Sequence, residues 1–323
     1  MQNRIAEGGF TLPVTVIYTM VVWLLAGLLS NGWWGQLALL AVSVYLIVEL
    51  SNGNALLRVR SRMVSSTFLV LSCIPVGLYG SLSGIFCFLC FVVALNLFFK
   101  SYQDGMSMGL AYYGFLFIGL ATWAFAPMLF FVPVLWLLMG IHLQSLSCRT
   151  WRASLLGLLT PYWVALPWFL YHNSLESYAD HFTSLFQLHL PYDYATLPTL
   201  QLLNVAFVVV LLLIGTVHFW FNSIDEKIRI RQFYGFFIFI AFYALAWIVL
   251  QPQYVQPLLW IVILCTSPLV AHFFTFTKSR ATNVFFLLIL TCCLLLTALN
   301  IFDPFLAYFP DLIARQWNGL LNF

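Results

Sequence analysis

Hydrophobic and polar positions alternate along this chain in long blocks: apolar segments of bilayer-crossing length are separated by short polar connections. A helix needs about 20 mainly apolar residues to cross a bilayer, and in lipid it satisfies all its backbone hydrogen bonds internally. The expected spans are 11–30, 35–50, 63–79, 84–99, 109–125, 128–143, 154–170, 201–221, 233–250, 258–276 and 282–301. The pattern therefore predicts an all-α, polytopic transmembrane bundle of about eleven spans.

Composition supports this class, because 63% of residues are hydrophobic and only 7% are charged, whereas soluble domains carry about 25% charged residues. The basic residues occur in small groups between apolar segments rather than in one patch, so we expect a lipid bilayer and no nucleic acid as partner. Cysteines lie mostly inside apolar runs, and no disulfide framework is predicted.

The distribution of basic residues predicts the orientation. With the N-terminus in the cytoplasm, eleven alternating spans place twelve of the thirteen Lys and Arg residues on the cytoplasmic side and leave Arg315 outside. The positive-inside rule favours this orientation, which puts the C-terminus outside. No soluble domain interrupts the spans. We expect one membrane domain: a seven-span module (1–170), an exterior loop (171–199), a four-span module (200–302) and an exterior tail (303–323).

The exterior loop contains the main candidate chemistry. Asn173 with an acid three residues later favours a helix start, and apolar residues at three- and four-residue spacing predict an amphipathic surface helix. His172, Glu176 and Asp180 follow one another at four-residue steps, with His181 adjacent, so several groups that bind cations or move protons can converge. We take Glu176, Asp180 and His181 as candidate catalytic residues. The alternative is that they only solvate the helix.

Other exterior side chains are candidates for substrate binding, together with His172. Arg315 is the only fixed exterior cation and would contact a lipid phosphate; the alternative is an i,i+4 pair with Asp311. Gln253 and Tyr254 offer neutral hydrogen bonds to sugars or headgroups. No metal ligand set is predicted.

Ionisable side chains inside the spans are confined to their expected cytoplasmic ends. They are Glu49, His142, His218 and His272. Two interpretations stay open: side chains that reach the headgroups, or a shared site on the inner face. The middle of the spans is apolar, unlike that of typical ion-coupled transporters.

The runs GLATWAFAPMLFFVPVLWLL and CRTWRASLLGLLTPYWVALPWFLYHNSLESYADHF, within residues 119–190, resemble the middle of membrane glycosyltransferases of the C superfamily. The resemblance implies a seven-span module followed by an exterior loop with a surface helix, a polyprenyl-phosphate-linked sugar as substrate and a divalent cation. The superfamily's catalytic acid stands in the first exterior loop, but the loops 31–34 and 80–83 contain no acid. Glu176 or Asp180 would have to replace it.

The sequence also resembles a family of bacterial inner-membrane proteins, which implies that location and no chemistry. Our leading hypothesis is a cell-envelope protein that handles a polyprenyl-phosphate- or phospholipid-linked substrate on the exterior face, as an enzyme or a degenerate relative of one. One alternative is a small-molecule or lipid transporter. Another is a structural subunit whose aromatic surface docks a membrane-protein partner.

Overall fold

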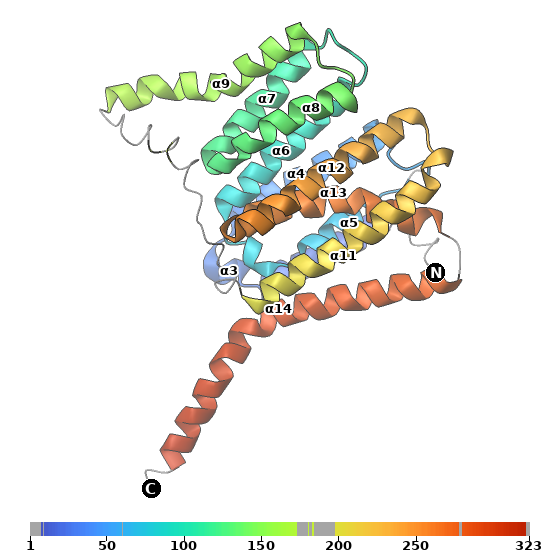
Figure 1. Ribbon diagram of the computed structural model, residues 1–323. Helices are drawn as coiled ribbons and strands as arrows, with labels where there is room; N and C mark the ends of the chain where they lie inside the picture. The colour runs from blue at the N-terminus through green and yellow to red at the C-terminus, as the bar shows by residue number, and fades with distance from the viewer. Residues whose placement is uncertain are drawn as a thin grey trace.

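The chain folds as a bundle of helices (Figure 1). The computed structural model describes residues 8, 10–59, 61–172, 180, 183, 198–277 and 280–320, and for residues 303–320 it describes the backbone alone. Within these residues all regular secondary structure is helical, which confirms the predicted all-α class.

The helices follow the predicted apolar segments in order. They are α2 (Thr11–Leu25), α3 (Leu28–Asn31), α4 (Trp34–Gly53), α5 (Met63–Ser72), α6 (Leu82–Lys100), α7 (Met108–Ala124), α8 (Phe131–Ile141), α9 (Cys148–Tyr171), α11 (Thr199–Asn222), α12 (Ile228–Leu250), α13 (Val255–Phe276) and α14 (Arg280–Leu320). Short 3₁₀ turns occupy Val76–Leu78, Ala126–Phe130, Ser223–Asp225 and Pro252–Tyr254.

Seven helices of the described chain are long and apolar enough to cross a membrane. They are α4, α6, α9, α11, α12, α13 and the part of α14 up to Phe302. The shorter apolar helices are Thr11–Leu25, Met63–Ser72, Met108–Ala124 and Ala126–Ile141. These lengths and compositions are those of a membrane protein, and the count of eleven crossings remains a prediction.

Two helices end earlier than the hydrophobic pattern predicts. α2 ends at Leu25, not at residue 30, because Gly27 takes a left-handed conformation with φ of 96° that interrupts the helix. α5 ends at Ser72, not at residue 79, shortly before Pro75, which has no N–H to continue the helix. In both cases the backbone of one residue ends the helix, although the residues that follow are apolar.

Prolines in α9 have the opposite outcome. The predicted seventh span, 154–170, contains Pro161 and Pro167, and α9 is one helix of 24 residues that includes both. It starts with a capping box in which the Ser147 hydroxyl accepts from the Thr150 backbone N–H. A proline removes one helical hydrogen bond and can bend a helix without ending it.

The C-terminal segment differs from the prediction in the length of its helix, because the last predicted span ends at residue 301 and the helix continues beyond it. α14 is continuous from Arg280 to Leu320, over 41 residues. Its last part turns away from the bundle (Figure 1). Pro304 and Pro310 lie in this part, and prolines are a common cause of bends in helices.

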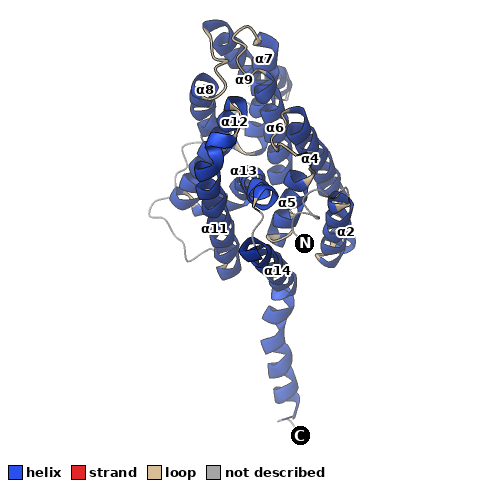
Figure 2. Cartoon of the chain, turned by 90° about the vertical axis from the view of Figure 1, so that its right-hand side faces the viewer, coloured by secondary structure: helices blue, strands red, loops and turns tan. Residues whose placement is uncertain are grey.

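The centre of the bundle is α13, which α5, α6, α11 and α12 surround (Figure 2). Its side chains from Leu258 to Ala271 are buried. Trp260 stacks on Phe88 with ring centroids 5.3 Å apart, and Phe88 stacks on Phe68 at the same distance. Aromatic packing of this kind supplies much of the contact between these helices.

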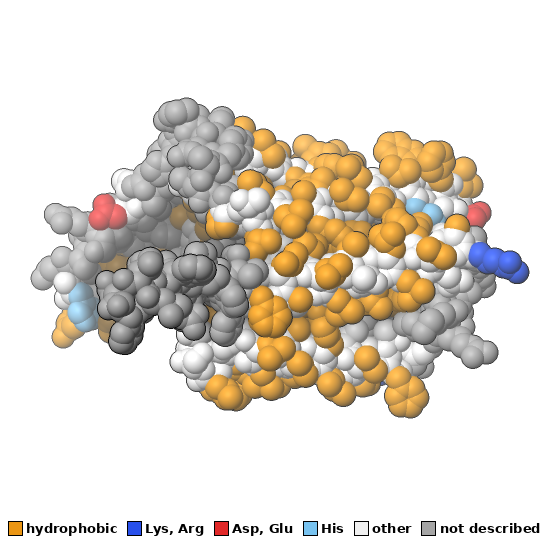
Figure 3. Space-filling model, turned by 90° about the horizontal axis from the view of Figure 1, so that it is seen from below, with side chains coloured by type: hydrophobic (Ala, Val, Ile, Leu, Met, Phe, Trp, Pro, Cys, Tyr) orange, Lys and Arg blue, Asp and Glu red, His pale blue; other side chains and the backbone are white. Residues whose placement is uncertain are grey.

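Basic residues gather at one end of the bundle. There the α4–α5 connection meets the start of α12, where Arg229 Nη2 donates to Asn54 Oδ1 at 3.1 Å. The end of α6 meets α4, where Lys100 Nζ lies 3.0 Å from Glu49 Oε1. Figure 3 shows Lys and Arg at one end and a hydrophobic band along the molecule. We call this the basic end.

The connections predicted to be exterior share the opposite end. Trp33 lies against Gly80, and the Tyr254 ring packs edge-on against Phe125 with centroids 5.3 Å apart. A Cβ on Gly84 would lie 4.0 Å from the Pro257 Cα, which links the two pairs, so this end joins the connections around residues 33, 80, 125 and 254. Among the connections that the structure describes, those predicted to be exterior thus lie at the end opposite the basic end.

Candidate functional site

The exterior-loop candidates are only partly within the described chain. Glu176 and His181 lie outside the described residues, as does the side chain of Arg315. Asp180 is exposed, and its backbone carbonyl accepts a hydrogen bond from Thr183 Oγ1 at 3.0 Å. The predicted convergence of His172, Glu176 and Asp180 thus stays a prediction.

His172 caps the C-terminal end of α9 and is exposed. Its ring lies over Trp168, with centroids 4.2 Å apart, and its Nδ1 is 2.9 Å from the Trp168 carbonyl oxygen. Within the described chain the other ring nitrogen, Nε2, makes no hydrogen bond. This arrangement suits a headgroup contact at the end of a span.

Gln253 and Tyr254 stabilise the α12–α13 turn. Gln253 Nε2 donates to Gln251 Oε1 at 3.2 Å, and Gln251 is buried. Tyr254 packs on Phe125 of the α7–α8 connection. The described contacts of these two residues are with the turn and with the α7–α8 connection, not with His172.

A groove of about 400 Å³ leads along α7 and α9 toward His172. It is lined by Leu116, Leu120 and Trp123 of α7 and by Thr160, Pro161, Val164, Ala165 and Phe169 of α9. All these residues belong to the halves of the two helices that lie away from the basic end. The groove is apolar, and Val164 is 74% exposed beside it.

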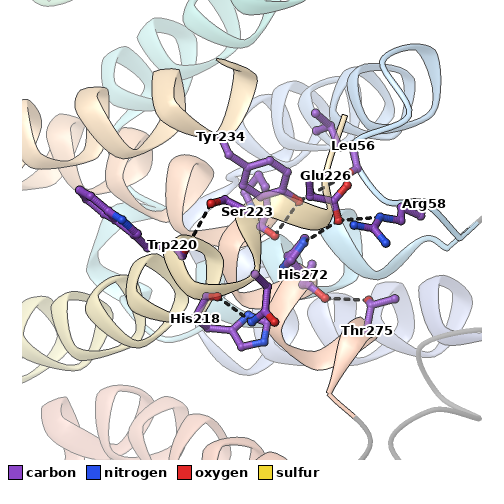
Figure 4. Close-up of polar contacts among 12 residues, drawn as sticks. Leu56, Arg58, His218, Trp220, Ser223, Glu226, Tyr234, His272 and Thr275 are labelled. Carbon is purple, nitrogen blue, oxygen red and sulfur yellow. Dashed lines mark hydrogen bonds and ion pairs between the residues drawn. The ribbon is translucent and has the colours of Figure 1, made fainter. Parts of the chain in front are cut away.

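At the basic end the structure assembles a polar cluster that contains a buried carboxylate (Figure 4). Glu226 ends the α11–α12 turn, and its side chain is 2% exposed. Its Oε1 accepts from Arg58 Nε at 2.9 Å and lies 3.2 Å from His272 Nε2. One oxygen thus joins the α4–α5 connection, the α11–α12 turn and α13.

Aromatic rings enclose this cluster. The Tyr234 hydroxyl lies 3.3 Å from the Leu56 and Pro268 carbonyls, and its ring is 5.3 Å from that of His272. Arg58 lies over the ring of Phe276, 5.6 Å from its centroid. His218 lies beside His272 with ring centroids 5.6 Å apart. The low-dielectric surroundings strengthen the Glu226 interactions and make an unpaired charge there costly.

Three buried polar atoms of this cluster have no hydrogen-bond partner within the described chain: Glu226 Oε2, His218 Nδ1 and His272 Nδ1. Buried polar atoms without partners are uncommon in native proteins. The cluster contains groups that exchange protons, but no group of three or more His, Cys, Asp or Glu residues in the described chain is placed to hold a metal ion.

The sequence predicts part of this site. Of the four ionisable residues at the inner ends of spans, His218 and His272 meet here. Glu49 instead pairs with Lys100, and His142 packs against Gly235 of α12.

Sequence reasoning missed Glu226 and Arg58, which it grouped with basic connections. The available signal was an acid within a basic segment, eight residues after His218.

Comparisons with protein families, with curated proteins and with solved structures gave no match. Function is therefore inferred from the residues and geometry of this chain.

Proposed function

We propose that this protein crosses the bacterial inner membrane eleven times, with its N-terminus in the cytoplasm, and handles a lipid-linked substrate on the exterior face. The substrate class is a polyprenyl-phosphate- or phospholipid-linked molecule. The observation that supports this best is the apolar groove between α7 and α9, which leads toward the end of α9 where His172 stands.

The groove suits a hydrocarbon chain. Its lining side chains are almost all apolar, with the Thr160 hydroxyl as exception, and that hydroxyl donates to the Leu156 carbonyl at 2.7 Å. A chain lying there would exchange lipid contacts for contacts with Trp123, Val164 and Phe169. Its polar end would then lie near the end of α9.

The polar end of the substrate would meet His172 and the loop that carries Glu176, Asp180 and His181. His172 directs its backbone-bonded Nδ1 toward α9, so Nε2 is the atom for a headgroup. Glu176 and Asp180 supply carboxylates that can accept a proton from an attacking hydroxyl. If the reaction is glycosyl transfer, a divalent cation would hold the phosphate, as the C-superfamily resemblance implies.

A polyprenyl phosphate carrying a photoactivatable group in its chain tests substrate binding. We expect it to label α7 or α9 at the groove, and Ala165→Trp, which fills the groove, to reduce labelling severalfold. Val217→Trp is the matched control, because Val217 is 53% exposed on α11 and does not line the groove. Equal labelling of both variants would contradict the proposal.

Activity is tested separately by complementation of a deletion strain. Glu176→Gln, Asp180→Asn and His181→Ala are each expected to reduce complementation at unchanged protein level. Full complementation by all three would show that the loop carries no catalytic group and would leave only lipid binding.

A further inference from the structure

A second cavity, at the basic end, has the size of a ligand site. It measures about 430 Å³, within the usual range of about 300–1,000 Å³ for small-molecule sites. Five helices line it: α5, α11 and α13, together with the start of α2 and the first part of α14. Of the α14 residues that line the cavity, Cys293 lies furthest from the start of the helix, near the middle of its apolar part.

Helix α14 closes this cavity by contacts on both sides of it. Phe286 packs edge-on against Phe274 of α13, with centroids 4.9 Å apart. Further along α14, the Tyr18 hydroxyl donates to Thr297 Oγ1 at 3.1 Å. The wall is therefore fixed at both ends, and the space behind it belongs to the folded bundle.

Most of the lining is apolar, yet two hydroxyls in it have no partner. Ser66 Oγ and Thr67 Oγ1 of α5 have no hydrogen-bond partner within the described chain, and these residues are only 2% and 8% exposed. Hydroxyls in helices usually bond a preceding backbone carbonyl. Ser65 and Ser72 of the same helix do so, at 2.9 and 2.8 Å. Ser66 and Thr67 thus line the cavity as residues whose buried hydroxyls have no acceptor within the described chain.

A charged residue, these two hydroxyls and an apolar side chain follow one another along α5, and of these only the charged residue, Arg62, is not part of the cavity lining. Arg62 is exposed directly before the helix, Ser66 lies one turn deeper, and Val70 lies one turn beyond that. Each four-residue step is about 6 Å along the axis. A glycerophospholipid has the same order: an anionic phosphate, ester carbonyls and acyl chains.

We propose that this cavity binds an acyl-ester phospholipid from the leaflet at the basic end. One acyl chain fills the apolar space, an ester carbonyl accepts from Ser66 and Thr67, and the phosphate lies beside Arg62. The ester selects this class over a polyprenyl phosphate, which has no carbonyl for the two hydroxyls. If this apolar space were empty, its lining side chains would lose van der Waals contacts. In a bilayer, lipid acyl chains are present to fill it. The site is separate from the α7–α9 groove and goes beyond the proposed function.

The test uses the full chain in detergent and a diacyl phosphatidylglycerol with a photoactivatable group in one acyl chain. Labelled peptides should come from α5 or α14 around Val70, Ile289 and Leu290. Unlabelled phosphatidylglycerol should compete about tenfold better than its dialkyl ether analogue, which lacks both carbonyls. In the double variant Ser66→Ala, Thr67→Val the two competitors should become equal. Ser65→Ala, whose hydroxyl bonds a backbone carbonyl, is the control.

Two further variants test the chain and headgroup contacts. Leu290→Trp fills the cavity and should abolish labelling, whereas Leu287→Trp, on the exposed face of the same helix, should not. Arg62→Gln should weaken labelling about fivefold. Equal competition by the ether analogue in the wild type would overturn the ester assignment, and unchanged labelling of folded Leu290→Trp would overturn the site. Ala165→Trp should leave this labelling intact, which separates it from the α7–α9 proposal.

Discussion

At the residue scale, Glu226 shows how one carboxylate holds three segments together. Its Oε1 contacts Arg58 and His272 from two other parts of the chain. Arg58 keeps much of its side chain exposed, at 43%, whereas Glu226 and His272 are buried. The Glu226 carboxylate therefore bears most of the desolvation cost. Loss of its partners, or of the carboxylate itself, should destabilise the contacts between the three segments at the basic end.

We expect Glu226→Ala to destabilise the protein by about 1–3 kcal/mol, because it leaves buried donors of His272 and Arg58 without an acceptor. Glu226→Gln keeps an acceptor oxygen and should cost less. Glu49→Ala is the matched control, since the Glu49–Lys100 pair is exposed and such pairs contribute about 0–1 kcal/mol. Thermal unfolding in detergent measures all three. A loss for Glu49→Ala as large as that for Glu226→Ala would contradict this role.

The residues of this cluster were only partly predictable from the sequence. His218 and His272 stand out because ionisable side chains are costly in apolar spans. Glu226 does not stand out, because an acid next to basic residues in a polar connection is typical of an exposed turn. Its burial depends on the α11–α12 turn folding against the α4–α5 connection, a contact between segments over 160 residues apart. No local pattern encodes such a contact.

At the scale of elements, hydrophobicity locates the helices and single residues determine their ends. Long apolar blocks predict the order and position of the helices because burial in lipid or core requires the same side chains. Gly27 and Pro75 shorten two of them, whereas Pro161 and Pro167 remain inside α9. α9 continues past both prolines although each removes a backbone hydrogen bond from the helix.

Close packing of α7 on α9 depends on Gly157. A Cβ at this position would collide with the Tyr112 carbonyl of α7. Gly157→Ala should therefore separate the helices and destabilise the protein by about 1–3 kcal/mol. Gly109→Ala, on α7 with nothing near its Cβ position, should be neutral or slightly stabilising. Thermal unfolding distinguishes the two, and equal melting temperatures would show that α9 moves without cost.

At the scale of the whole molecule, the two ends of the bundle differ in charge. Two of the basic connections, α4–α5 and α11–α12, contact each other through the Arg58–Glu226 and Arg229–Asn54 pairs. Basic connections are retained on the cytoplasmic side of bacterial membranes. The structure thus adds a spatial grouping to the sequence-based orientation, and the side of the membrane is open to direct measurement.

Cys148 makes that measurement possible with the native chain. It lies exposed at the start of α9, at the basic end, whereas the other cysteines, all within the described chain, are buried or only partly exposed. A membrane-impermeant maleimide should label inside-out vesicles and leave right-side-out vesicles unlabelled, because the proposed orientation puts Cys148 in the cytoplasm. Cys148→Ser should remove the labelling. In that background Asp180→Cys, on the exterior loop, should be labelled in right-side-out vesicles only. Labelling of both positions from one side would refute the assigned span count between them, since α9 alone separates Cys148 from Asp180.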